Sequence, residues 1–218
     1  KYDGFSITGM AYKNTWNSTD QIPQRAMSSG LIGRFGAIDP TDGGETSRYS
    51  LSYAMHKRTQ DSLFELNAYA VQSRLKLFSN FTYFLDNPAD GDQFQQSENR
   101  RMYGLNAAQT WIDKVGGITM QNKIGFQTRY DRLSPVGLYD TIAQERTATV
   151  REDKVKEASM GVYAENSAQW LDKFRTVAAL RYDAYRFNVD SDIAGNSGKA
   201  RDHTVSPKLS LIFGPWAR

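Results

Sequence analysis

The chain has 218 residues, 12% of them aromatic, no cysteine and a formal net charge of +3, with a mean hydropathy of −0.61. The absence of cysteine excludes a disulfide framework and a zinc–thiolate site. Basic and acidic residues are spread along the whole sequence, so the charge predicts no nucleic-acid-binding surface. No stretch approaches the roughly 18 apolar residues of a transmembrane helix, but a membrane-spanning β-strand needs only one apolar face.

Alternation of apolar and polar residues with period two recurs along the chain. In residues 118–130, Ile124 and Phe126 lie on one side and Lys123 and Gln127 on the other. Successive side chains of a strand point to opposite faces, so each such segment predicts a two-faced strand. No segment has a convincing helical stripe, and the chain is therefore predicted to be all-β. The segments are 5–16, 48–56, 62–75, 102–112, 118–130, 155–170, 174–188 and 204–213.

Short and long connections alternate between these segments. In an antiparallel up-and-down meander, this order puts every long loop at one end, as in transmembrane β-barrels of the outer-membrane type. Charged residues in mid-strand suit a wet lumen better than a packed core, although a soluble β-sandwich remains the alternative. The expected long connections are 17–47, 76–101, 131–154 and 189–202, and the short ones are 57–61, 113–116 and 171–173.

An ordered series of short stretches resembles the barrel domain of bacterial TonB-dependent outer-membrane receptors. No single motif is diagnostic, and the resemblance spans nearly the entire chain. The stretches are Asp3-Gly4-Phe5 with 16–23, Asp39-Pro40-Thr41-Asp42-Gly43-Gly44 continuing to 50, Leu77-Phe78-Ser79-Asn80-Phe81 continuing to 85, Leu180-Arg181-Tyr182-Asp183, and 206–211.

The resemblance implies a 22-stranded barrel in the Gram-negative outer membrane, closed by an N-terminal plug domain. Such receptors import a scarce nutrient, commonly a ferric siderophore, with energy delivered by TonB. Residues 1–218 are accordingly expected to form part of a single β-barrel domain, about eight strands, without the plug through which TonB acts. Outer-membrane lipid and lipopolysaccharide are the expected surroundings. The alternatives are a complete eight-stranded barrel with a structural or adhesion role, whose first and last strands would pair, and a soluble β-rich binding module.

Candidate ligand-binding residues lie in or beside the expected long loops. Aromatic rings can stack on a planar ligand, or else form an interfacial girdle, and arginines can pair with an anionic ferric complex. Leu66, Ile124 and Leu180 are expected to face lipid. The aromatic candidates are Phe78, Phe81, Tyr83 and Phe84, and the basic candidates are Arg25, Arg34, Arg129 and Arg132. The residues expected to face the lumen are Lys123, Gln127, Arg181, Asp183 and Glu65.

Catalysis, cofactors and resident metals have little support in the sequence. His56 and His203 are the only histidines, and they form no Ser/His/Asp arrangement. The acidic stretch 86–92 lacks the ligand spacing of an EF-hand and is interpreted as a solvated loop. The protein is therefore expected to be neither an enzyme nor a cofactor carrier.

Overall fold

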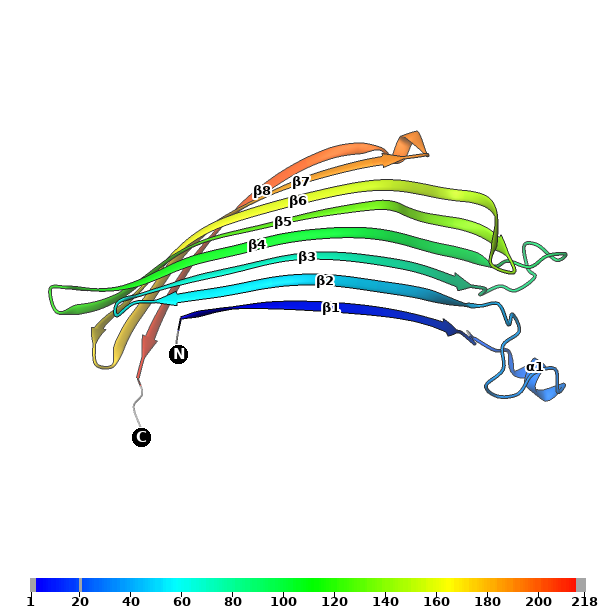
Figure 1. Ribbon diagram of the computed structural model, residues 1–218, viewed down its shortest axis with the longest axis horizontal. Coiled ribbons are helices and arrows are strands. Elements are labelled where there is room, and N and C mark those ends of the chain that lie inside the picture. Colours follow the sequence, from blue (N-terminus) through cyan, green and yellow to red (C-terminus); the bar gives the residue numbers. More distant parts are fainter. Residues whose placement is uncertain (1–2, 20, 215–218) are drawn as a thin grey trace.

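The computed structural model describes residues 3–19 and 21–214, which form one antiparallel sheet of eight strands in the order β1 to β8 (Figure 1). All eight predicted segments lie within these strands. No helix of the described residues is long and apolar enough to cross a membrane. The strands are β1 (Gly4–Asn17), β2 (Gly43–Arg58), β3 (Ser62–Ser79), β4 (Phe94–Val115), β5 (Ile118–Ile142), β6 (Glu145–Leu171), β7 (Phe174–Ser191) and β8 (Gly198–Phe213); α1 (Gln24–Ser28) and η1 (Ala194–Asn196) are short helices in the connections.

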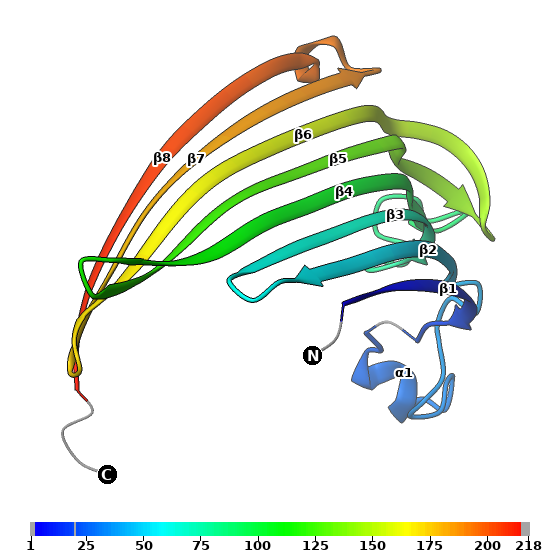
Figure 2. The ribbon, with the colours of Figure 1, turned by 60° about the vertical axis from the view of Figure 1, so that its left-hand side comes forward.

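The sheet is curved and open. Each strand pairs with its neighbours in the sequence, so β1 and β8 are the two edges, and Figure 2 shows them on opposite sides of the arch. Within the described residues, β1 pairs only with β2 and β8 only with β7. The first strand therefore does not pair with the last, as a complete eight-stranded barrel would require.

The register of the strands brings every predicted apolar face to the same side of the sheet. Residues directly opposite each other in an antiparallel pair share a face. We call this side the apolar face and the other side the polar face. One continuous row on the apolar face consists of Phe5, Met55, Leu66, Ala107, Phe126, Val162, Tyr182 and Val205.

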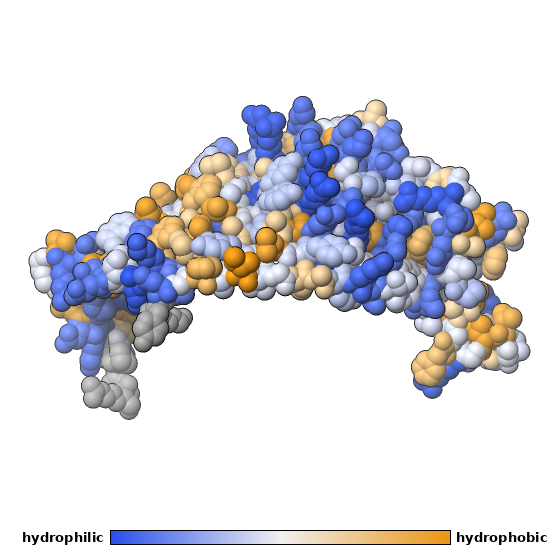
Figure 3. Space-filling model, viewed as in Figure 1, coloured by the Kyte–Doolittle hydropathy of each residue, from blue (hydrophilic) through white to orange (hydrophobic). Residues whose placement is uncertain are grey.

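Exposure along the central strands is the reverse of that in a water-soluble sheet. On the apolar face, Ile124 is 51% exposed and Leu180 is 55% exposed, whereas Asp131 and Asp183 on the polar face are 2% and 9% exposed. No second layer formed by the described residues covers the hydrophobic side chains, many of which lie at the surface of the arch (Figure 3). Among the described hydrophobic residues, only Ala26, Phe78, Leu133, Tyr139 and Ala168 are buried. Exposed apolar surfaces of this extent are typical of contacts with a membrane or with another protein.

The connections are sorted between the two ends of the sheet, as expected, although the connection predicted to be long over 189–202 spans only residues 192–197. The short turns 59–61, 116–117 and 172–173 lie at one end, which we call the turn end. The other end, the loop end, carries α1 and η1 within the connections 18–42 and 192–197, together with the connection 80–93 (Figure 1).

The prediction of a long loop over residues 131–154 is wrong. Strands β5 and β6 continue through this region and are joined only by Ala143 and Gln144, both with positive φ, a geometry typical of a two-residue hairpin turn. Irregularities in the β5–β6 register, beginning between Leu133 and Val136, interrupt the alternation of side chains. The turn residues Ala143 and Gln144 also lack the asparagine or glycine that is usual in such a turn. The sequence therefore shows neither a regular alternation nor a turn motif from which this hairpin could be predicted.

The two faces predict opposite responses to a new charge in a lipid bilayer. Ile124→Arg should lower the free energy of unfolding by about 2–4 kcal/mol, because it places a cation among lipid chains. Gln127→Arg, on the polar face of the same strand, is the matched control and should be tolerated. Unfolding by denaturant in lipid vesicles measures both, and equal tolerance would show that the apolar face does not contact lipid.

Candidate functional site

Arginines on three neighbouring strands pair with an aspartate two residues further along the same strand. Arg129 donates Nε and Nη2 hydrogen bonds to Asp131 at 2.6 and 3.1 Å, and Arg181 does so to Asp183 at 2.7 and 2.6 Å. Because side chains two residues apart share a face, each aspartate neutralises the charge of its arginine on the polar face. The pairs are Arg129–Asp131 on β5, Arg151–Asp153 on β6 and Arg181–Asp183 on β7.

Two glycines let this polar layer lie close against the sheet. Tyr163 is directly opposite Gly125, and a Cβ at Gly125 would stand 2.2 Å from the Tyr163 ring. The Arg181 guanidinium lies 5.8 Å from the centroid of the same ring, within the range of a cation–π contact. A Cβ at Gly161 would meet Arg181 and Asp183 at 2.5 and 2.6 Å. A larger residue at Gly125 would displace the Tyr163 ring, and one at Gly161 would displace the Arg181–Asp183 pair.

All five residues expected to face the lumen lie on the polar face. Lys123 is directly opposite Glu165, and Gln127 is opposite Gly161, which is itself opposite Asp183. The row that contains Arg181 runs through Tyr163, Gly125 and Ala108 to Glu65. The fold thus places all five residues on one side of the sheet. That this side lines a lumen remains a prediction.

At the loop end, the buried side chain of Gln93 ties three connections together. Its Nε2 donates to Thr41 Oγ1 at 2.7 Å and Asp42 Oδ1 at 3.1 Å in the connection 18–42. Its Oε1 accepts from Thr141 Oγ1 at 3.0 Å and the Gln144 backbone N–H at 2.8 Å in the β5–β6 hairpin. Only 3% of Gln93 is exposed, so its amide replaces water as the partner of these groups. We call this set of contacts the Gln93 cluster.

The acidic stretch 86–92 is organised around a single carboxylate. Asp92 accepts backbone hydrogen bonds from Leu85, Asp86 and Asn87 at 2.8, 3.2 and 2.7 Å. Desolvation opposes its ionisation, but hydrogen bonds from Thr82 and these backbone groups outweigh desolvation and lower the pKa of Asp92. Both oxygens are thus already used, and no group of three or more acidic, histidine or cysteine residues in the described part of the chain could hold a metal ion.

The four aromatic candidates do not form one stacking platform. Phe78 is 7% exposed, while Phe81 and Phe84 are 62% and 54% exposed. Phe81 contacts Phe94 edge-on at a centroid distance of 5.3 Å. Tyr83 has a φ of 62° and donates its hydroxyl hydrogen bond to the Gln21 carbonyl, which links the connections 80–93 and 18–42.

The four arginine candidates lie apart. Arg25 is on α1, and Arg34 is exposed later in the same connection. Arg129 and Arg132 lie within β5, not beside a loop, and the odd spacing between them puts Arg129 on the polar face and Arg132 on the apolar face. The structure therefore does not bring these four residues together.

A cavity of about 670 Å³ lies beside the Gln93 cluster. On one side, the Arg146 guanidinium stacks over the Tyr139 ring at 3.6 Å and donates a hydrogen bond to Gln95. Burial, followed by the hydrogen bond to Glu152, raises the pKa of Tyr139 to about 12. Sequence reasoning missed these residues because they fall in the region expected to be a loop. The lining includes Trp16, Glu45, Lys76, Phe78, Gln95 and Arg146.

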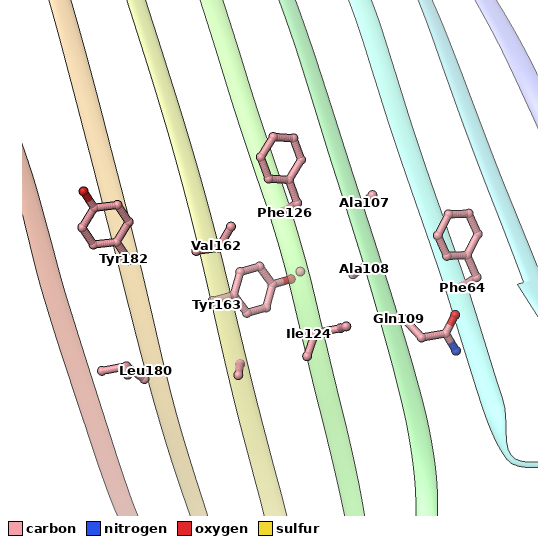
Figure 4. A pocket seen from close by; sticks show the side chains of 12 residues that line it. Phe64, Ala107, Ala108, Gln109, Ile124, Phe126, Val162, Tyr163, Leu180 and Tyr182 are labelled. Carbon is pink, nitrogen blue, oxygen red and sulfur yellow. The ribbon is translucent and has the colours of Figure 1, made fainter.

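A second hollow, of about 590 Å³, is almost entirely apolar. It spans the middle strands and is bordered by Phe64 and Tyr182, with Ala107 and Val162 between them (Figure 4). The small side chains leave room that the larger rings do not fill. This hollow has no charged lining residue and lies among the residues expected to face lipid.

Comparisons with known proteins agree with this architecture. Residues 2–217 match the family model described as "TonB dependent receptor-like, beta-barrel". The structure resembles the ferric citrate transporter FecA in its unliganded form, with a TM-score of 0.75, 11% identity, and coverage of 98% of this chain and 32% of FecA. It also resembles the ferric yersiniabactin uptake receptor FyuA from Yersinia pestis, with a TM-score of 0.60, 13% identity, and coverage of 96% of this chain and 32% of FyuA. The chain thus spans about a third of each solved structure. A search of curated proteins found no match.

Replacing Gln93 should loosen all three connections together. Gln93→Ala leaves several buried polar groups without their partner, which should lower local stability by about 1–3 kcal/mol. Hydrogen exchange should accelerate in residues 80–92 and in the β5–β6 hairpin at once. Gln96→Ala, an exposed position on β4, is the control, and faster exchange confined to one connection would contradict the shared role.

The ordered form of the stretch 85–92 should depend on ionised Asp92. Because its pKa is lowered from 3.8, its contribution should be complete above that value and lost as the pH falls through the folded-state pKa. Asp92→Asn should remove the pH dependence and accelerate amide exchange at residues 85–87 even at neutral pH. The control is Asp90→Asn; unchanged exchange in Asp92→Asn would refute the role of the carboxylate.

Proposed function

Because the chain belongs to the TonB-dependent receptor-like β-barrel family, we propose that it forms part of the wall of a receptor that imports a small extracellular ligand across the Gram-negative outer membrane. The observation that carries this proposal is the reversed exposure of the sheet, with hydrophobic side chains outward and paired charges on the polar face. A membrane barrel needs this distribution, and the sorting of turns and loops between its two ends agrees with it. The family consists of receptors and transporters, not enzymes.

The polar face of this sheet lines the lumen in the proposed receptor. Its Arg–Asp pairs satisfy charged groups within one strand, so they can stand beside water or a plug without an ion partner from elsewhere. Lys123, Gln127, Arg181, Asp183 and Glu65 belong to this lining. A wall that carries both signs of charge would let a hydrated ligand pass without holding it by one net charge.

The sheet belongs to one larger barrel domain in this proposal. Both β1 and β8 present an unpaired edge in the described structure, and unpaired backbone groups are not tolerated within a bilayer. Further strands on both sides would satisfy these edges. A plug domain within the completed barrel would contact TonB, and outer-membrane lipid with lipopolysaccharide would surround the apolar face.

The ligand is proposed to be a scarce nutrient such as a ferric siderophore, which meets the loop end first. FecA and FyuA, which share the fold, are described as a ferric citrate transporter and a ferric yersiniabactin receptor. In the lining of the loop-end cavity, Lys76 is paired with Glu45 at 2.6 Å, so Arg146 is the cation that the cavity offers to an anionic complex. Exposed Phe81 and Phe84 offer ring faces, and Arg25 and Arg34 are further exposed cations at this end.

Arg132 does not belong with the ligand-binding candidates. It lies on the apolar face, away from the polar face that carries Arg129. Phe78 contributes to the cavity wall, and Tyr83 holds two connections together through its hydroxyl. Replacement of Tyr83 could therefore change ligand binding through the position of these connections as well as through the loss of a direct contact.

Loss of the Phe81 ring should weaken ligand binding by the intact receptor. An aromatic contact is worth about 0.5–1.5 kcal/mol, so Phe81→Ala should reduce affinity roughly 2- to 12-fold. Tyr83→Phe separates the hydroxyl contact from ring stacking and should alter exchange in the connection 18–42 more than affinity. Uptake and equilibrium binding of a labelled ferric siderophore measure the effect, with Ile193→Ala as control. Unchanged affinity in Phe81→Ala would leave that ring without a role in binding.

A further inference from the structure

A hollow of about 460 Å³ lies on the polar face, between side chains of β3 to β6. We call it the polar-face hollow. Its lining includes the aliphatic side chains Leu75, Val136 and Leu138. Glu98 on β4 and Asp153 on β6 also line it, and each is directly opposite Val136 on β5. The hollow therefore combines an aliphatic lining with a carboxylate on either side.

The polar-face hollow lies beyond the membrane-spanning part of the sheet, toward the loop end. On β5, the hydrophobic side chains of the apolar face end at Tyr130, because Arg132 follows on the same face. Tyr130 is opposite Ala158 on β6. Asp153 is further toward the loop end by five residues, or roughly 16 Å of strand at about 3.3 Å per residue. In the proposed receptor, this level is on the outer side of the membrane.

The Arg151–Asp153 pair beside the hollow differs from the other arginine–aspartate pairs of the polar face. In those pairs the guanidinium donates to both oxygens of the aspartate, as Arg181 does to Asp183. Arg151 instead contacts Oδ2 of Asp153, with Nη2 at 2.6 Å, and Oδ1 is buried without a hydrogen-bond partner among the described residues. A buried acceptor without a donor is costly. A ligand that donates to Oδ1 would therefore gain binding free energy.

The carboxyl group of Asp153 is ionised at neutral pH in spite of its burial. Only 5% of the residue is exposed, and desolvation alone would raise its pKa. Arg151 and the hydroxyl of Ser191, which is directly opposite Asp153 on β7, outweigh desolvation and lower the pKa. Neither group makes a hydrogen bond of normal geometry with Oδ1. The oxygen without a donor thus belongs to a negatively charged group.

The chemistry of the lining favours a cationic donor. Its charged residues are two carboxylates, Glu98 and Asp153, and one guanidinium, Arg151. Both oxygens of Glu98 are used by Arg100, at 2.9 and 3.1 Å, so Asp153 is the one with a remaining acceptor. The terminal torsion of an aspartate is broad and two-fold, so a small rotation can share its carboxylate between Arg151 and a second donor. An ammonium group on an aliphatic arm matches both the charge and the aliphatic lining.

We propose that the polar-face hollow binds a primary ammonium group of the imported ligand, with Oδ1 of Asp153 as the acceptor of its hydrogen bond. Leu75, Val136 and Leu138 contact the aliphatic arm that carries this group. The inference rests on the proposed receptor function and deepens it, because it assigns a free amine to the ligand. A ligand from outside reaches this level of the lumen first, which favours the ligand over the plug as the source of the cation. The site is distinct from the loop-end cavity, in which Arg146 offers the opposite charge.

The test uses three five-carbon probes with different groups at the chain ends: diaminopentane, pentanediol and glutarate. They present a cation, a neutral donor and an anion at the same chain length. Binding to the intact receptor in nanodiscs is followed by methyl NMR of Leu75, Val136 and Leu138, which line the hollow. The test variant is Asp153→Asn, and the matched control is Asp190→Asn, which changes an exposed aspartate on β7.

We expect diaminopentane to bind at least about tenfold more tightly than pentanediol, because a hydrogen bond to a charged group is stronger than one between neutral groups. Asp153→Asn should remove this preference, whereas Asp190→Asn should retain it. Added salt should weaken the binding of the diamine, because the hollow is open to solvent. Equal binding of the diamine and the diol, or tighter binding of glutarate, would overturn the inference.

A second variant keeps the inference testable if Asp153→Asn fails to fold. Val136→Phe preserves every charge and places a larger side chain between Glu98 and Asp153. It should abolish the methyl shifts that diaminopentane causes at Leu75 and Leu138, and unchanged shifts would contradict the proposed site. A hollow already filled by a basic side chain of the plug would give no shift in the wild-type receptor, and that result would also refute binding of the ligand there.

Failure of this inference is distinguishable from failure of the proposed function. If Ile124→Arg destabilises the receptor in a bilayer while Asp153→Asn leaves the binding of diaminopentane unchanged, the barrel-wall assignment stands and the ammonium site does not. If Ile124→Arg is tolerated as well as Gln127→Arg, the lipid-facing assignment itself fails, and the inference that depends on it fails too.

Discussion

Cross-strand register is the constraint on which the rest of this structure depends. A slip of one residue between two strands would send every side chain of one strand to the opposite face. The seven pairings keep the hydrophobic side chains on one side through the middle of the sheet, and the main register shifts occur toward the strand ends, as between Glu98 and Arg100 and between Leu133 and Val136. The two faces can therefore carry different chemistry across all eight strands.

Each face handles charge in its own way. On the polar face, Arg129, Arg151 and Arg181 are each neutralised by an aspartate of their own strand, and glycines give side chains space against the backbone. On the apolar face, the middle of each strand is largely uncharged, and cations appear only where that band ends. The same residue type, arginine, thus has opposite surroundings at positions 129 and 132, which are three residues apart. Side-chain direction, not distance along the sequence, determines the role.

Much of the fold follows from the sequence, because alternation over a dozen residues specifies both a strand and its faces. The register places the predicted apolar side of every segment on one face of the sheet, and Ile124 and Leu180 lie on that face. The extension of β5 and β6 could not be read, because bulges break the period and Ala143-Gln144 lacks the usual turn residues. The Gln93 cluster was equally hidden, since it depends on three connections meeting in space. The Arg–Asp pairs are present in the sequence as an i, i+2 spacing. This spacing brings the two side chains together only where the chain is a β-strand, so the ion pairs follow only once the strands are known.

The Gln93 cluster also has a consequence for the entropy cost of folding. Gln93 joins groups about 50 positions away along the chain in both directions, and Gln144 reaches Thr41 across 103 positions. Contacts between such distant segments close long loops of the chain, at a cost in chain entropy. Alignment of the strands from β2 to β6 brings these partners together and so reduces the entropy cost of the contacts that Gln93 makes. The loop end is thus the part of the molecule whose contacts depend most on the correct placement of all five strands.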